Sequence, residues 1–191
     1  MIVSEGYGSF TIAKLANQAE VTIPTIHNLI GNKSEVFKRL VEEMVVRIDE
    51  ALVPENISNP IEASEIFIDR LIALFAKDEN FYKAAFVVGE QEKLFEHEKS
   101  DGIFKKSLSI AHRICEEAKI NGYLNGEIDS WLLADRLFAN QRLARQDWIQ
   151  GYINLKEYRT QVITGMCITF ASDAAESFHK TLIAYIANLK T

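Results

Sequence analysis

Hydrophobic residues recur every three or four positions along most of the chain, which is the spacing that places side chains on one face of an α-helix. The clearest stripe begins after Ser34 and continues to Leu52, just before Pro54. Comparable stripes predict further helices over residues 12–19, 23–30, 61–75, 81–95, 103–120, 131–150, 155–171 and 178–189. No segment of convincing length alternates polar and apolar residues, as a half-buried β-strand does. The pattern therefore predicts an all-α fold of about nine helices.

Few residues interrupt these stripes. The chain contains three prolines and nine glycines, a composition that favours long helices over many short strands joined by tight turns. The densest group of helix-breaking residues lies between Pro54 and Pro60. We therefore expect a small N-terminal unit over residues 1–53, which includes the long helix, and a larger helical unit over residues 54–191.

The overall composition is typical of a folded, soluble protein, with 48% hydrophobic and 25% charged residues. No segment approaches the roughly 18 to 20 uninterrupted apolar residues of a membrane span. Residues 1–10 lack the basic start and apolar stretch of a secretory signal. We therefore expect a cytoplasmic protein that has no membrane partner.

Charge restricts how this chain can bind nucleic acid. The net charge is −6, which repels phosphate, so DNA binding has to rely on a local patch. The first 40 residues carry four basic and three acidic side chains, a net charge of +1. Because neutralised phosphates supply much of the affinity for DNA, this small excess predicts weak or strongly salt-sensitive binding.

Two short helices near the N-terminus have the features of a helix-turn-helix. Thr11 is placed to cap the helix over residues 12–19, and Thr22 is placed to cap the next one. Pro24 falls in the first turn of that second helix, where a missing N–H is tolerated. Val21, in the turn between them, is expected to pack inward. Such a pair of helices fits the major groove of DNA, with the second helix as the recognition helix.

Residues 3–40 resemble the N-terminal signature of the tetracycline-repressor (TetR) family of transcriptional regulators. The residues that carry the resemblance are Gly6, Tyr7, Thr11, Leu15, Ala16, Ala19, Val21, Thr22, Thr25, Ile26 and Lys33. Beyond them the likeness is architectural, with a long linking helix, a divergent helical body and a Trp148-x-x-Gly151 ending of the penultimate segment. The resemblance implies a ligand-responsive repressor, a homodimer whose N-terminal units bind a palindromic DNA operator and whose bodies each hold a small-molecule pocket.

The same resemblance implies which side chains face DNA. They lie at the caps, on the recognition helix and at the start of the long helix: Thr11, Thr22, Ile23, Pro24, Thr25, His27, Asn28 and Lys33. Thr22, Thr25 and Asn28 offer short hydrogen-bonding groups to bases or phosphates. Lys33 offers a charge that neutralises a phosphate at the positive end of a helix.

Several positions depart from the family pattern. Glu20 stands where a turn glycine is usual, Ile23 stands where a basic or polar residue is frequent, and His27 replaces a tyrosine. Residues 1–5 precede the turn at Gly6, where the family has a full first helix, so we expect that this helix is truncated or that the protein starts upstream. These departures leave a second interpretation open, a helical dimeric ligand-binding or interaction protein with a degenerate DNA-binding unit.

Aromatic residues are concentrated in the larger unit, where they are able to line a ligand pocket. The candidates for contact with a small apolar or amphipathic ligand are Phe86, Phe104, Leu108, His112 and Phe138. The alternative is that aromatic residues at helical spacing pack the core, and that His112 is hydrogen-bonded there or lies at the surface. The case for a pocket rests on the resemblance, because the residue pattern alone is typical of packing.

The two predicted helices over residues 131–150 and 155–171 carry wide apolar faces. Two such helices from each of two subunits are able to build a four-helix interface, so we expect a homodimer through them. Arg136, Arg142 and Arg145 are expected to rim this interface or to lie on a solvent-exposed face.

Catalytic and metal-binding signatures are not visible in the sequence. We find no paired nucleophile and base, no phosphate-binding glycine loop and no histidine or cysteine cluster with ligand spacing. His97, between two glutamates, is typical of a solvated face, and Cys115 and Cys167 are typical of reduced core residues. We therefore expect no enzymatic activity and neither a metal nor a cofactor.

Overall fold

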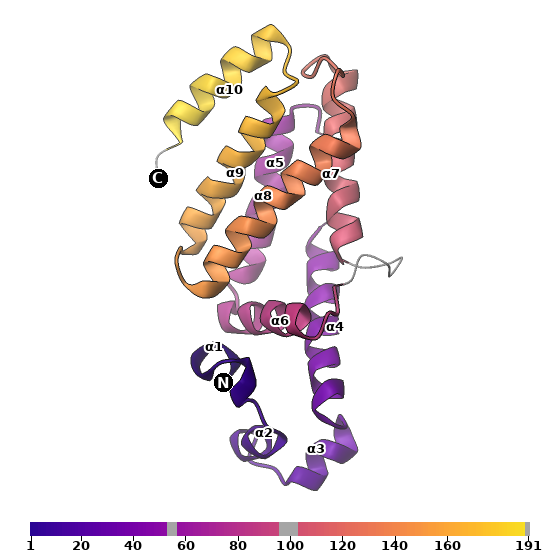
Figure 1. Cartoon of the computed structure of the whole chain (residues 1–191), viewed down its shortest axis with the longest axis vertical. Helices are drawn as coiled ribbons and strands as arrows, with labels where there is room; N and C mark the ends of the chain where they lie inside the picture. The colour runs from indigo at the N-terminus through magenta and orange to yellow at the C-terminus, as the bar shows by residue number, and fades with distance from the viewer. Residues whose placement is uncertain (53–56, 96–102, 190–191) are drawn as a thin grey trace.

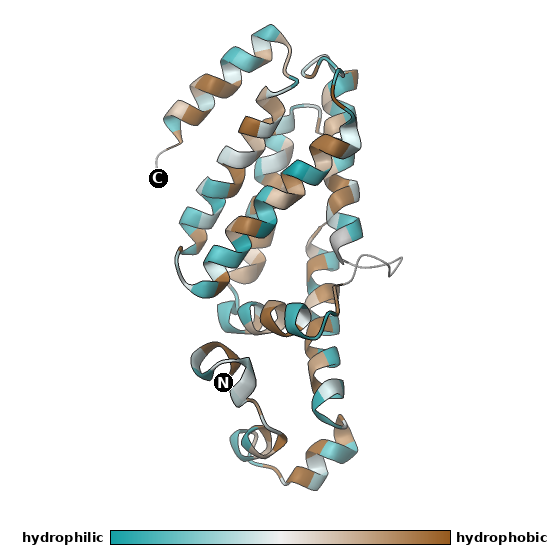
Figure 2. Ribbon diagram, viewed as in Figure 1, coloured by the Kyte–Doolittle hydropathy of each residue, from teal (hydrophilic) through white to brown (hydrophobic). Residues whose placement is uncertain are grey.

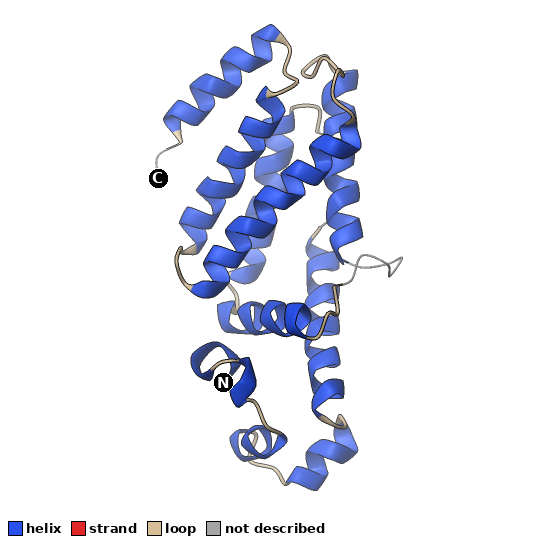
Figure 3. Ribbon diagram, viewed as in Figure 1, coloured by secondary structure: helices blue, strands red, loops and turns tan. Residues whose placement is uncertain are grey.

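The computed structural model describes residues 1–52, 57–95 and 103–189, the first two residues of the last range by their backbone alone. Within these ranges the chain forms α-helices and turns but no β-strand (Figure 3), so the predicted all-α fold is confirmed. The elements follow one another as α1 (Ile2–Glu5), η1 (Tyr7–Ser9, a 3-10 turn), α2 (Ile12–Gln18), α3 (Ile23–Leu29), α4 (Lys33–Ala51), α5 (Pro60–Phe75), α6 (Glu79–Gln91), α7 (Ile103–Ile120), α8 (Ser130–Gln150), α9 (Leu155–Ala171) and α10 (Glu176–Asn188). Nine of the helices coincide with the predicted stripes, and the short α1 is the addition.

Helix α6 ends at Gln91 rather than at residue 95, where the hydrophobic pattern predicts its end. Lys93 adopts a left-handed backbone conformation with φ of 54°, and the N–H of Leu94 donates to the carbonyl of Gly89 at 2.8 Å. The chain therefore reverses, and the ring of Phe95 packs on Gly89 so closely that no β-carbon fits there. The apolar stripe continues past the helix because these residues fold back onto it.

The helices form a small N-terminal group, a crossing helix and a larger body (Figure 1). Helices α1, α2 and α3 make up the N-terminal group at one end of the molecule. Helix α4 leads from this group to the body and packs along α6 and α7, and α6 crosses between the group and the body. In the body α8 packs against α7 and α9, α5 packs against α9, and α10 lies on α9. Hydrophobic residues recur along the helices of both parts (Figure 2).

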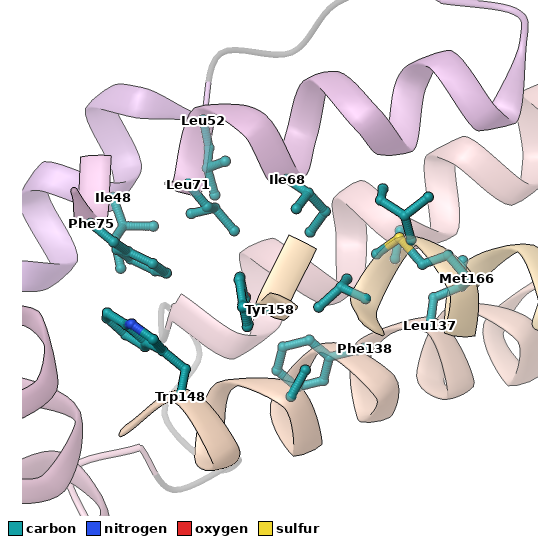
Figure 4. Packing of buried hydrophobic residues seen from close by; sticks show 14 of the residues in the cluster. Ile48, Leu52, Ile68, Leu71, Phe75, Leu137, Phe138, Trp148, Tyr158 and Met166 are labelled. Atoms are coloured by element: carbon teal, nitrogen blue, oxygen red, sulfur yellow. The ribbon is translucent and has the colours of Figure 1, made fainter. Parts of the chain in front are cut away.

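One hydrophobic core extends from α4 into the body (Figure 4). Trp148 and Tyr158 are fully buried, and the indole of Trp148 stacks on the ring of Phe75 with centroids 5.1 Å apart. Ile48 of α4 and Leu52, the residue that follows α4, belong to the same cluster. The predicted boundary between the two units falls at residues outside the described ranges, so the division into two units stays a prediction.

Polar contacts fasten α9 and α10 to α5. The guanidinium of Arg159 donates to the two carboxylate oxygens of Asp69 at 2.6 and 2.9 Å and to Glu65 at 3.0 Å. The hydroxyl of Tyr185 donates to the same oxygen of Glu65 at 2.6 Å. Because a two-pronged arginine–carboxylate pair fixes geometry better than a single contact, these bonds set the position of the last two helices.

Within the described ranges, no helix is both long enough and apolar enough to cross a lipid bilayer.

Candidate nucleic-acid interface

The turn between α2 and α3 is tight and contains a residue in the left-handed conformation, Glu20 with φ of 55°. The N–H of Val21 donates to the carbonyl of Ala16 at 2.9 Å and closes the end of α2. A glycine, the residue usual in the TetR pattern, reaches this conformation without strain, whereas the same conformation costs a residue with a side chain about 1–2 kcal/mol. The helix-turn-helix geometry is therefore kept despite the departure at Glu20.

Both helices of the motif begin with the predicted threonine caps. The hydroxyl of Thr11 accepts from the N–H of Lys14 at 3.1 Å, and the hydroxyl of Thr22 accepts from the N–H of Thr25 at 3.3 Å. The hydroxyls of Thr22 and Thr25 also form a hydrogen bond of 2.8 Å with each other. These threonines therefore define the start of each helix in addition to any contact with DNA.

Most of the predicted DNA-facing residues lie on the outward side of α3. Ile26 is buried and holds the helix in the N-terminal group, whereas Ile23, Pro24, His27 and Asn28 are exposed. The predicted residues at the start of α2 and α4 lie apart from this row. The structure thus gathers the larger part of the predicted set on one short helix, and their contact with DNA stays a prediction.

Lys33, the first residue of α4, is turned towards the protein. Its ammonium donates to the carbonyl of Phe10 at 3.1 Å and lies 5.2 to 5.7 Å from the ring centroids of Tyr7, Phe10 and Phe37. Cation–π contacts of this kind contribute about 0.5–2 kcal/mol, depending on how far water is excluded. Lys33 therefore fastens the start of α4 to the segment that contains Tyr7 and Phe10 in this structure, a role different from the phosphate contact that the family resemblance implies.

The exposed side of the N-terminal group carries apolar residues and little uncompensated charge. Leu29 is 68% exposed. Val21, which was predicted to pack inward, is exposed, and the buried residues of α2 and α3 are Ala16 and Ile26. Lys14 forms an ion pair with Glu5 at 2.7 Å. The side chains of α1 to α3 thus carry one base, Lys14, against two acids, Glu5 and Glu20, and the net charge of +1 over residues 1–40 comes from the first residues of α4.

The N-terminal group is joined to the body through α6. The hydroxyl of Tyr7 donates to the carboxylate of Glu92 at the C-terminal end of α6, and this hydrogen bond raises the pKa of Tyr7. Helix α1 packs on α6, with Ile2 buried. The ring of Tyr7 in turn lies 5.3 Å from that of Phe37 on α4. A continuous row of contacts therefore connects α6 with the start of α4.

The predicted ligand contacts are dispersed through the body. Phe86 and Phe138 are buried, Leu108 is half-buried, and His112 stacks on an exposed tryptophan of α8 with ring centroids 3.7 Å apart. The side chain of Phe104 lies outside the described residues. None of the five lines the groove between α8 and α9 or the smaller cleft between α6 and α8, so their role in ligand binding stays a prediction.

An open groove of about 510 Å³ lies between α8 and α9, on the two helices predicted to form a dimer. Leu143 and Ile168 line it and are 68% and 60% exposed. Gly165 forms part of its floor, where the amide of Asn140 donates to the glycine carbonyl at 3.0 Å. Large apolar side chains around a shallow groove are typical of a surface that another protein covers.

Arg145 is not at the rim of this face. It is 5% exposed and turned towards α6, because its place on α8 coincides with the buried stripe that contains Leu137, Gln141 and Trp148. This register, four residues after Gln141 and three before Trp148, is a sequence signal that distinguishes Arg145 from its neighbours. Arg136 and Arg142 are exposed.

Cys115 and Cys167 are free and buried, as predicted, and burial raises the pKa of each thiol to about 12. Among the described residues no group of three or more histidine, cysteine, aspartate or glutamate side chains is placed to hold a metal ion.

The architecture is that of a helix-turn-helix unit followed by an all-helical body. It is shared with the crystal structure of a TetR-family transcriptional regulator from Marinobacter aquaeolei VT8, with a TM-score of 0.65 and 14% sequence identity over 100% of this chain and 93% of that chain. Neither profiles of known protein families nor curated protein sequences match the chain. The chain therefore has the TetR-family fold, which confirms the predicted resemblance at the level of structure.

Proposed function

We propose that this protein is a ligand-responsive transcriptional regulator that acts as a repressor by binding a palindromic DNA operator as a homodimer. The observation that carries the proposal is the position of α3 in a fold of the TetR type, capped by Thr22 and presenting Pro24, His27 and Asn28 outward. A capped helix with short polar side chains on its exposed face suits the major groove.

Dimerisation is proposed through the groove between α8 and α9. The exposed Leu143 and Ile168 supply apolar contact area, and the groove between them accepts side chains of a second copy. A two-fold arrangement pairs the same patch on both subunits and places the two α3 helices on successive half-sites of a palindrome. The dimer thereby doubles the number of contacts that one recognition helix makes with DNA.

The test of DNA binding is selection of bound sequences from a random duplex library, followed by a salt titration of the selected site. We expect a palindromic site whose affinity falls about tenfold or more when Asn28 is replaced by alanine, because a good base contact contributes about 1–3 kcal/mol. Asn188→Ala is the matched control, since Asn188 is exposed on α10, far from α3 in the chain.

A second function is favoured by a specific observation. Leu29 is strongly exposed and the Lys33 ammonium is turned inward, so the N-terminal group has an apolar surface and few outward charges. These features suit a dimeric ligand-binding or interaction protein whose DNA-binding unit has degenerated. Selection that enriches no sequence from a protein shown to be a folded dimer would favour this function over the first.

A further inference from the structure

The outward side of α3 combines hydrocarbon and amide side chains. Ile23 is 44% exposed, and Pro24 and Asn28 are exposed as well. Pro24 and Asn28 are four residues apart and therefore share one side of the helix, and Ile23 adjoins Pro24. An exposed hydrocarbon side chain gains free energy when a partner covers it with apolar surface. The chemistry of these residues therefore restricts which base pairs α3 is able to recognise.

The sequence of α3 lacks the charged side chains that most often recognise G·C pairs. Residues 23–29 contain neither arginine nor lysine, which bind guanine, and neither aspartate nor glutamate, which accept hydrogen bonds from cytosine. The nearest lysine or arginine along the chain is Lys33, and its ammonium is turned towards the protein, where it donates to the carbonyl of Phe10. The side chains of α3 are therefore better suited to A·T pairs.

Two threonines near the beginning of α3 are engaged with each other. The hydroxyl of Thr22 accepts from the N–H of Thr25 at 3.3 Å and forms a hydrogen bond of 2.8 Å with the Thr25 hydroxyl. Part of their hydrogen-bonding capacity is therefore used within the protein. The amide of Asn28 offers a donor and an acceptor, the pair of groups that matches N7 and N6 of adenine.

We propose that α3 recognises A·T base pairs and that Ile23 contacts the 5-methyl group of a thymine in each half-site of the operator. This methyl group is the apolar feature that distinguishes thymine in the major groove. Cytosine places an amino donor in the groove, and an apolar side chain that covers this donor leaves it without a hydrogen bond. The inference rests on the proposed function, because it specifies the DNA that the helix-turn-helix binds.

The position of Ile23 suits this contact. It directly follows the capping residue Thr22, and the residues near the beginning of a recognition helix are those that contact base edges. The part of the side chain that is not exposed is covered by the protein, which limits its movement. Because its β-carbon is branched, Ile23 also has few side-chain conformations in a helix. Contact with DNA therefore costs this side chain little conformational entropy.

A contact with a methyl group differs from a phosphate contact in its dependence on salt. Neutralised phosphates release counterions, so their contribution to affinity falls as the salt concentration rises. Burial of apolar surface releases no counterions. Removal of the thymine methyl group is therefore expected to reduce operator affinity by the same factor at low and at high salt, although the affinity itself changes.

The test uses the duplex that the full chain selects and replaces its thymines by uracil, one position at a time. Uracil lacks the 5-methyl group and keeps the base pair and its hydrogen-bonding groups. We expect one position in each half-site at which uracil weakens binding, by about fourfold in one half-site and about 15-fold in both, the effect of one buried methyl-sized group for each subunit. These factors are expected to agree at about 50 mM and about 200 mM salt.

A variant assigns the methyl contact to Ile23. In Ile23→Ala the shortened side chain no longer covers the methyl group, and we expect the thymine and uracil duplexes to bind with nearly equal affinity. Ile183→Ala is the matched control, because Ile183 is an isoleucine of α10 with a similar exposure of 52%, and it is expected to keep the full difference between the two duplexes. A difference that persists undiminished in Ile23→Ala would overturn the assignment.

The outcomes separate this inference from the proposed function. Selection that enriches no sequence rejects the proposed function and the inference with it. A selected operator in which uracil weakens binding at no position, or in which the conserved pairs of each half-site are all G·C, rejects the inference alone and leaves the proposed DNA binding standing. A preference for thymine that disappears in Ile23→Ala and persists in Ile183→Ala supports both.

Discussion

The body and the N-terminal group differ in how their helices are stabilised. In the body, helices such as α8 and α9, of 21 and 17 residues, pack around a core that contains Phe75, Trp148 and Tyr158. Helices α2 and α3 have seven residues each, and each buries a single side chain, Ala16 and Ile26. Helices shorter than about 12–15 residues are marginal in water on their own. The N-terminal group therefore depends on α4 and α6 for its order.

The difference suits the function proposed above. A helix pair with little buried surface changes position or opens locally at a low free-energy cost, while a body with a continuous core stays folded. The contacts that set the position of the pair are few and specific: Tyr7 with Glu92, and Lys33 with the rings around it. Small changes in α6 are therefore able to reach α3 without unfolding the body.

The largest expected effect comes from the body core. Trp148→Ala removes the ring stacked on Phe75 and the N–H donor to Glu79, and we expect a loss of about 3–5 kcal/mol in the free energy of unfolding. Urea denaturation followed by far-UV circular dichroism measures it.

Ile26→Ala is the counterpart in the N-terminal group. Both tryptophans of the chain, Trp131 and Trp148, lie on α8, so tryptophan fluorescence reports on the body. We expect Ile26→Ala to leave the urea concentration at the midpoint of the fluorescence transition unchanged. The helical signal in far-UV circular dichroism is expected to fall at urea concentrations below this midpoint. A variant that shifts both signals together would show that the two parts unfold as one.

The next effect concerns the outer face of the body. Leu143→Glu places a charge in the proposed dimer groove, and we expect the dissociation constant of the dimer to rise about 100-fold or more, because a buried charge without a partner costs several kcal/mol. Sedimentation equilibrium measures the change. Ile120→Glu, at an exposed isoleucine of α7, is the control and leaves the dimer intact. A wild-type chain that is monomeric at micromolar concentration would contradict the interface.

A third prediction uses the two thiols of the body core. Burial raises the pKa of Cys115 and Cys167 to about 12 from an ordinary value of 9.0, so the folded chain keeps protons that the unfolded chain releases above pH 9. This contribution to stability is complete below pH 9 and is lost as the pH rises towards 12, by up to about 1.4 kcal/mol per thiol and pH unit.

The measurement compares urea denaturation at pH 8 and pH 10. We expect the wild-type chain to lose about 2.7 kcal/mol more between these two values than the double variant Cys115→Ala, Cys167→Ala, which lacks both titrating groups. The comparison uses the change in the free energy of unfolding with pH within each protein. The destabilisation caused by the cavities that the substitutions leave is the same at both pH values and therefore cancels. Equal losses in the two proteins would show that the thiols titrate alike in the folded and unfolded states.

Most of the helices were predictable because their signals are local. The capping threonines and the hydrophobic spacing of α4, α8 and α9 lie within the elements that they define. The end of α6 was not predictable, since it depends on Phe95 folding back onto Gly89. The local spacing of hydrophobic residues predicts a helix, but it does not predict which of the following residues fold back and pack on that helix.

The candidate site was predictable to a smaller extent. The row on α3 follows from helical geometry, whereas the inward turn of Lys33 depends on rings contributed by Tyr7, Phe10 and Phe37, which only the folded chain brings together. The inward position of Arg145 was missed for the same reason, because the Glu90 carboxylate near it is distant in sequence. The apolar register of Arg145 was the available signal.

Lys33 gives the fourth prediction, on the N-terminal group. Lys33→Met keeps the aliphatic part of the side chain and removes the charge, and we expect a loss of about 1 kcal/mol from the cation–π contacts and the bond to Phe10. If the Lys33 ammonium stays turned towards the protein when DNA is bound, the slope of the logarithm of operator affinity against the logarithm of salt concentration is the same in Lys33→Met and in the wild-type chain. A slope reduced by about 0.9 for each Lys33 would instead assign this residue to a phosphate.

The smallest expected effect is at the turn between α2 and α3, where Glu20 has a φ of 55°. Glu20→Gly removes the strain of a side chain in the left-handed region but adds freedom to the unfolded chain, so we expect a net gain of up to about 1 kcal/mol in the stability of the N-terminal group. Hydrogen exchange of the α2 and α3 amides measures it, and Gly8→Ala, at a glycine without positive φ or close neighbours, is the comparison. Because α6 and the body core are untouched, their amides keep their protection. Slower exchange in α2 and α3 with unchanged exchange in the body would show that strain at Glu20 limits the stability of the N-terminal group. Unchanged exchange throughout would show that this stability is set by the contacts with α4 and α6.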